Sequence, residues 1–253
     1  MIAKVPSTAV RTQLAPTGVL RAAINLSNFL LVVEREPSPR GPSPRLAQAV
    51  AEALGVPLQL VLFETPSEVA EAAKDNVWDV ANIGNEPQRA EHIDFTSAYV
   101  EIAATYLVRQ GSKLKTATDV DCPGNRVAVK KGSAYGLWLE NNMSTAELVA
   151  LPGSDDEVFA AFAGQHFDAL AGLRPGLLKQ QLKLSGSKIT EGHFTAVQQA
   201  VGLRKGKPEA LEWLQNFVED AKRDGLIESW IQSYGLQGKL SVAPLESLCQ
   251  RSL

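Results

Sequence analysis

The chain has 253 residues, of which 45% are apolar and 21% are charged, and its formal net charge is −3. This composition is ordinary for a globular protein and excludes an intrinsically disordered or collagen-like chain. The slight acidic excess, without a basic stripe, argues against nucleic-acid binding, because neutralisation of phosphates drives that binding. At roughly 100–200 residues per domain, the length predicts two lobes or one large α/β unit.

The cysteines and histidines indicate neither a disulfide framework nor a metal site. Cys122 and Cys249 are the only cysteines, and we expect both to be unpaired thiols. His92, His166 and His193 lack the spacing of metal ligands. We therefore predict no metal and no cofactor.

The beginning of the sequence does not have the pattern of a secretory leader. Pro6, Arg11, Gln13 and Pro16 interrupt the region where a leader needs a continuous apolar stretch. No apolar run reaches the roughly 18 residues that a membrane helix requires. As written, the sequence predicts a cytoplasmic chain with no membrane insertion.

Strands and helices alternate over the first hundred residues. We expect strands at residues 19–24, 58–63 and 78–83 and helices at about 46–54 and 65–74. A Pro-rich loop precedes the first helix, and polar turn-forming residues follow the first strand. This β-α-β-α-β order predicts a parallel sheet flanked by helices.

The alternation restarts after residue 104 and predicts a second α/β unit. Its strands are expected at residues 105–108, 126–129, 147–151 and 167–171, and its helices at about 135–139, 155–162 and 174–182. One more strand (196–203), two helices (about 211–218 and 226–234) and a loose tail follow. Since open parallel sheets bind ligands at the carboxyl ends of their strands, the residues alone predict a bilobed binder or a cleft enzyme.

One segment carries a specific resemblance. Residues 77–99, VWDVANIGNEPQRAEHIDFTSAY, are similar to the core of the extracellular solute-binding proteins of the polar amino-acid type, family 3, which are receptors of ABC importers. Further matches to this family follow in the family's order at residues 126–135, 167–170, 201–206 and 224–227. Together these matches span about residues 17–235, nearly the whole chain.

The resemblance implies an α/β fold of the two-lobed periplasmic-binding-protein-like (type II) kind, with a ligand cleft between the lobes. Residues 1–108 plus 196–253 would form lobe one, and residues 109–195 would form lobe two. The chain would cross the hinge twice, near residues 107–110 and 195–197. In this family, ligand binding closes the lobes by hinge motion.

The resemblance also implies ligand contacts in lobe one. Arg89 stands at the family position whose guanidinium binds the ligand's α-carboxylate, a task that suits its planar fork. The alternative is a surface arginine that pairs with Glu86 or Glu91 on one helix. Asn82 and Gly84 match positions that contact the ligand through side chains or carbonyls, and the alternative for them is a plain strand-end turn.

Further candidate contacts lie in two loops. Ser133 and Ala134 follow a glycine at a strand-to-helix junction, where N–H groups and a hydroxyl can bind a carboxylate. A simple N-cap is the alternative for Ser133. Asn25, Asn28 and Phe29 occupy the region where relatives place an aromatic or polar wall.

One departure from the family bears on the ligand. Relatives that bind α-amino acids carry an acidic residue about five positions after the aspartate of their FDA strand, where it pairs with the α-ammonium. Counting from Asp168 leads to Leu173, which is followed by Arg174. Because an unpaired ammonium in a closed cleft is costly, the departure favours a carboxylate without an amine, or a larger anion that meets Arg89 and Arg174. If the alignment shifts here, another acid serves instead.

The expected function is therefore binding of a small carboxylate-bearing solute, an amino acid or related organic acid, without catalysis. The chain would be the substrate-binding protein of an ABC importer, with a permease as partner, and periplasmic if a leader is missing from this sequence. One alternative is a leaderless cytoplasmic sensory or regulatory receptor. Another is an enzyme similar to cyclohexadienyl dehydratases, for which Glu86, expected to face solvent, is the spare general acid.

Overall fold

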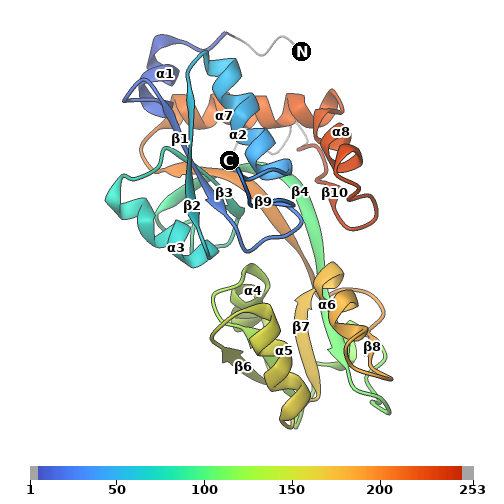
Figure 1. Cartoon of the computed structure of the whole chain (residues 1–253). Helices are drawn as coiled ribbons and strands as arrows, with labels where there is room; N and C mark the ends of the chain where they lie inside the picture. The colour runs from blue at the N-terminus through green and yellow to red at the C-terminus, as the bar shows by residue number, and fades with distance from the viewer. Residues whose placement is uncertain (1–4, 247–253) are drawn as a thin grey trace. The chain divides into compact units, whose positions relative to one another are not determined.

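The computed structural model describes residues 5–246 and divides into two compact units (Figure 1). Unit 2 consists of Ile102–Val197, and unit 1 consists of the described residues on either side of that segment. Each unit combines a sheet with helices, and the chain passes from one unit to the other twice. The predicted α/β fold of two lobes joined by two crossings is confirmed.

Both passages between the units lie inside strands. The first lies in β4 (Ile93–Val108), after Glu101, and the second in β9 (Thr195–Arg204), after Val197. The first boundary is earlier than the expected crossing at residues 107–110 because the end of β4 already pairs with β7 (Ala169–Leu173) of unit 2. We expected only the last four residues of β4 to be a strand.

The sheet of unit 1 contains the three strands expected in the first hundred residues. The central strand β1 (Leu20–Asn25) pairs in parallel with β2 (Leu58–Phe63) and β3 (Val80–Gly84). On its other side, β3 pairs antiparallel with β9. The parallel arrangement brings the ends of β1 and β3 to the same edge, which positions the loops that follow them.

Helices pack against this sheet, and they begin and end at the signals that the sequence carries. Thr65 caps the helix α3, and Gly55, in a left-handed conformation, ends α2. The helix α1 was not predicted; Ser7 caps it, and it buries Val10 and Leu14. The elements of unit 1 not yet listed are α1 (Thr8–Leu14), α2 (Pro42–Leu54), α3 (Pro66–Glu71), the 3-10 helix η1 (Ala72–Asp75), α7 (Pro208–Arg223), α8 (Leu226–Ser233) and β10 (Ser241–Val242).

In unit 2, β5 (Arg126–Lys130) is central and pairs in parallel with β6 (Glu147–Leu151) and β7. Alternate residues of β5 enter two hydrophobic clusters. Val127 packs with Leu139 of α4, whereas Ala128 packs with Phe162 of α5. This is the period of two that a sheet covered on both faces requires. The remaining elements are η2 (Ala117–Asp119), α4 (Ala134–Asn142), α5 (Asp155–Gly164), α6 (Arg174–Gln181) and β8 (Lys188–Ile189).

The structure also bears on the expected absence of a membrane helix and on the two cysteines. Within residues 5–246, no helix is long and apolar enough to cross a membrane. Cys122 is an exposed, unpaired thiol, as expected, whereas Cys249 and the end of the expected tail lie outside the described residues.

Candidate functional site

The end of β3 holds three of the predicted ligand residues together within unit 1. Asn82 is buried in the strand, and its Nδ2 donates to the carbonyl oxygen of Ser43, in the first turn of α2, at 2.9 Å. Gly84 ends β3, and its carbonyl oxygen accepts a hydrogen bond of 2.9 Å from Nη1 of Arg89. The sequence therefore folds so that Asn82, Gly84 and Arg89 share one edge of the sheet.

The segment between β3 and β4 is a tight turn, not the helix on which the alternative for Arg89 depended. Strand pairing continues to Asn85, whose N–H donates to the carbonyl of Gln198 at 2.8 Å, and β4 begins at Ile93, so only a turn fits between them. In this turn, the backbone N–H groups of Arg89 and Ala90 donate to the carbonyl of Glu86 at 2.9 and 3.0 Å.

The turn buries both of its central charged side chains. Arg89 is 5% exposed and Glu86 is 6% exposed. The alternative that Arg89 is a surface arginine is therefore wrong, and so is the expectation that Glu86 faces solvent. Arg89 donates to Gly84, but the carboxylate of Glu86 has neither a hydrogen bond nor an ion pair to any described residue. A buried guanidinium thus lies in one turn with a buried acid, and the charges of the two groups influence each other.

Burial shifts the pKa values of this pair in opposite directions. Loss of solvation raises the pKa of Glu86 to about 7, and the positive charge of Arg89 opposes that rise. Loss of solvation lowers the pKa of Arg89, and the negative charge of Glu86 opposes that fall. Near neutral pH, Glu86 therefore changes between its neutral and charged forms beside a guanidinium.

Two buried residues that the sequence analysis did not single out adjoin this edge. Ser43 is 2% exposed and supplies the carbonyl to which Asn82 donates. Tyr99, the last residue of the matched core segment, is fully buried in β4, which raises the pKa of its hydroxyl, while the hydroxyl of Ser43 opposes that rise. Ser43 thus holds Asn82 in place. The position of Tyr99 within the motif is the only signal that could have pointed to it.

In the loop after β1, the asparagine side chains accept hydrogen bonds from residues two positions further along the chain. Oδ1 of Asn25 accepts from both the N–H and the hydroxyl of Ser27, at 3.1 and 2.9 Å, and Oδ1 of Asn28 accepts from the N–H of Leu30 at 3.2 Å. The amide Nδ2 of each asparagine has no partner among the described residues and remains as a donor. Phe29 lies between them and is half-buried. The loop can therefore offer two N–H donors and an aromatic wall.

The predicted residues of unit 2 lie at the start of α4. Ser133 is its N-cap: the hydroxyl accepts from the N–H of Gly136 at 3.1 Å and donates to the carbonyl of Lys130 at 2.7 Å. The backbone N–H groups of Ala134 and Tyr135 have no acceptor within residues 5–246. The N-cap role of Ser133 is thus confirmed, and its contact with a ligand stays a prediction.

Arg174 is the first residue of α6, immediately after Leu173 at the end of β7. Its Nη2 donates to the carbonyl oxygen of Gly192 and, at 3.5 Å, to that of Thr190. The guanidinium thus links the start of α6 to the segment before β9 through hydrogen bonds. Its predicted contact with a ligand anion remains untested, and its Nη2 already has acceptors in unit 2.

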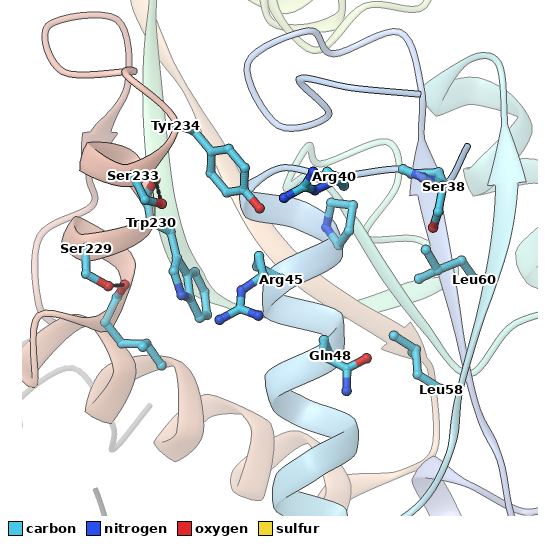
Figure 2. Close-up of a pocket in the computed structure, with 13 residues that line it drawn as sticks. Ser38, Arg40, Arg45, Gln48, Leu58, Leu60, Ser229, Trp230, Ser233 and Tyr234 are labelled. Atoms are coloured by element: carbon cyan, nitrogen blue, oxygen red, sulfur yellow. Dashed lines mark hydrogen bonds between the residues drawn. The ribbon is translucent and has the colours of Figure 1, made fainter. Parts of the chain in front are cut away.

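An open groove of about 750 Å³ lies elsewhere in unit 1 (Figure 2). Figure 2 shows Arg40 and Arg45 with Trp230 and Tyr234 around it. Arg40 already pairs with Glu34 at 3.3 Å. Among the described residues, those lining this groove include none of the predicted ligand contacts, so the candidate site remains the turn after β3. The lining comprises Ser38, Pro39, Arg40, Pro44, Arg45, Gln48, Leu58, Leu60, Leu226, Ser229, Trp230, Ser233 and Tyr234.

In the part of the chain that the structure describes, no group of three or more histidine, cysteine, aspartate or glutamate side chains is placed to hold a metal ion.

Comparison with known proteins agrees with this architecture. The family model of the bacterial extracellular solute-binding proteins, family 3, matches residues 23–237, so the chain belongs to this family. The resemblance seen in the sequence is therefore confirmed. The chain is a solute-binding protein of the kind that serves ABC importers, and members of the family are extracellular binding proteins.

Three relatives illustrate the range of the family. The L-cystine-binding protein TcyJ of Escherichia coli is 24% identical over 185 residues, 72% of this chain and 69% of the relative. The ABC transporter glutamine-binding protein GlnH of Bacillus subtilis is 24% identical over 157 residues, 60% of this chain and 57% of the relative. The crystal structure of an ancestral amino acid-binding protein, a precursor of cyclohexadienyl dehydratase, superposes with a TM-score of 0.69 at 23% identity, covering 90% of this chain and 99% of that one.

Proposed function

We propose that this chain binds a small carboxylate-bearing solute, an amino acid or related organic acid, for an ABC importer and does not transform it. The observation that carries the proposal is the buried guanidinium of Arg89, which the Gly84 carbonyl holds at the end of β3. A guanidinium removed from water is stabilised by an anion, and a carboxylate matches its planar fork.

The other predicted contacts would complete the recognition of that solute. Asn25 and Asn28 offer amide donors, Phe29 offers an apolar wall, and Ser133 and Ala134 offer donors at the start of α4. These groups suit an anionic ligand because hydrogen bonds to a charged acceptor are stronger than those to a neutral one. We also propose that Asn82 and Gly84 contribute acceptors, since Asn82 lies within β3 and Gly84 ends it.

The proposal includes an ABC permease as partner and a location outside the cytoplasmic membrane. Support comes from the family, whose members are extracellular solute-binding proteins, and from GlnH, which is named for an ABC transporter. The enzyme alternative would need a general acid, and Glu86, with a pKa of about 7, has the chemistry for it. Recovery of a bound ligand unchanged after long incubation, by mass spectrometry, separates the two.

The test is a thermal-shift and calorimetric titration against the L-amino acids, L-cystine and matching acids without the amine. A ligand at about 100 times its Kd adds roughly 2.7 kcal/mol to the stability of the folded state. Arg89→Lys keeps the charge but loses the fork, and we expect affinity to fall about 100-fold. Arg45→Lys, an exposed position in the same unit, is the matched control. Equal binding by Arg89→Lys and wild type would refute the proposal.

A further inference from the structure

The strand β2 is an open edge of the sheet of unit 1. Within the described residues it pairs with β1 alone, and no strand or isolated bridge lies on its other side. The N–H of Leu20 in β1 donates to the carbonyl of Pro57, immediately before β2, at 2.9 Å. Because the backbone groups of successive strand residues point to opposite sides, those of Leu58, Leu60 and Leu62 point away from β1.

The sequence of β2 lacks the features that protect an open edge. Its residues, LQLVLF, include neither a charged side chain nor a proline. Figure 2 shows Leu58 and Leu60 beside Gln48 of α2 in the groove described above, and Leu62, on the same face of the strand, is 47% exposed. Proteins protect such edges with lysine, proline or a bulge, because unpaired backbone donors and acceptors form a template for another strand. The edge of β2 therefore offers both backbone groups and apolar surface to another strand.

This edge is complementary to itself. When a second β2 is placed antiparallel to the first about a two-fold axis, Leu60 lies opposite Leu60 of the second copy and Leu58 lies opposite Leu62. Opposite residues of this kind exchange N–H···O=C bonds, so the outward backbone groups of all three leucines find partners. The Cβ atoms of opposite residues lie about 4.5–5.5 Å apart on one face, which covers the exposed Leu62 with Leu58 of the second copy.

The charges of α2 follow the same symmetry. Arg45 and Glu52 are both exposed and lie two turns apart on one side of the helix, at a separation of about 10 Å along its axis. Arg45 and Gln48 line the groove beside β2, and Gln48 donates to Glu52 at 2.9 Å. A two-fold axis through Leu60 reverses the direction of the second α2, so Arg45 of each copy lies toward Glu52 of the other. The antiparallel arrangement thus brings opposite charges together, whereas a parallel one would bring like charges together.

We propose that β2 pairs antiparallel with β2 of a second copy of this chain, so that the sheets of two copies of unit 1 join into one. The pairing goes beyond the proposed function, because it uses no residue of unit 2 and no predicted ligand contact. Each copy would therefore keep its own candidate site.

Sedimentation velocity of the full chain over a series of concentrations tests the association. We expect wild type to change from monomer to dimer as the concentration rises. Leu62→Lys places a charge at the edge and should raise the Kd of the dimer at least about tenfold. Leu178→Lys, at a 46% exposed leucine of α6, is the matched control and should change that Kd less than about threefold. A wild type that stays monomeric at every concentration, or equal effects of the two substitutions, would overturn the proposal.

Reversal of the charges on α2 tests the two-fold arrangement. Arg45→Glu should raise the Kd of the dimer about tenfold, because it would face Glu52 of the second copy. Arg45→Glu combined with Glu52→Arg should return the Kd to within about threefold of the wild-type value. A double variant that associates no better than Arg45→Glu would contradict the antiparallel pairing.

Hydrogen exchange of the wild type then tests which edge is used. As the concentration rises, the amides of Leu58, Leu60 and Leu62 should become protected, whereas those of Gln59 and Val61, which point toward β1, should change little. A dimer in which the three leucine amides exchange as fast as in the monomer would pair through another surface and would overturn the proposal.

Discussion

The buried state of Glu86 makes a specific prediction about stability without any ligand. Burial raises the pKa of this carboxyl from 4.5 to about 7 in the folded chain. The folded state therefore holds the proton more tightly than the unfolded state between these two values. By linkage, the free energy of unfolding must then fall as the pH rises through this window.

The expected magnitude follows from the size of the change in proton affinity. Each tenfold change is worth about 1.4 kcal/mol, so the rise from 4.5 to about 7 corresponds to about 3 kcal/mol. Below about pH 4.5 both states are protonated and Glu86 imposes no penalty. Above about pH 7 the folded state carries the full penalty of about 3 kcal/mol. Glu86→Gln does not titrate, so its stability relative to wild type should increase by that amount across the window.

The assay is urea unfolding of ligand-free wild type, Glu86→Gln and Glu91→Gln at several pH values from about 4.5 to about 8. Ligand must be removed first, because a bound ligand would add its own binding free energy to the measured stability. We expect the difference between Glu86→Gln and wild type to grow with pH, and the difference for exposed Glu91 to stay near zero. A difference that is constant, or that shrinks as the pH rises, would show that Glu86 is not the buried acid described above.

Three further substitutions test the stability of the two units and the role of Ser133. Asp79 is fully buried and forms a 2.8 Å ion pair with Arg21, so Asp79→Asn should lower the free energy of unfolding by about 3 kcal/mol in denaturant titrations; an unchanged value would show that this pair does not stabilise the fold. Ser133→Ala and Ser154→Ala each remove an N-cap and should each cost about 1 kcal/mol in stability. Only Ser133→Ala should also weaken ligand binding by calorimetry, and equal affinities for the two variants would remove Ser133 from the site.

Much of the fold could be predicted because its signals are local. The strands β2 and β6 have the predicted bounds, and Gly55 and Thr65 lie at the predicted end of α2 and start of α3. Alternation and capping depend only on neighbouring residues, so a sequence displays them directly. The length of β4 was not predicted, because its pairing partners come from elements distant in the sequence: β10 at its middle and β7 at its end.

The candidate site shows the same division between local and distant causes. The role expected of Arg89 came from its position within a family motif, and that position can be read directly from the sequence. The burial of Glu86 did not follow from its surroundings in sequence, where Pro87, Gln88 and Glu91 are polar or turn-forming. Its burial depends on the pairing of Asn85 with Gln198, a contact across more than a hundred residues that closes the turn against the sheet.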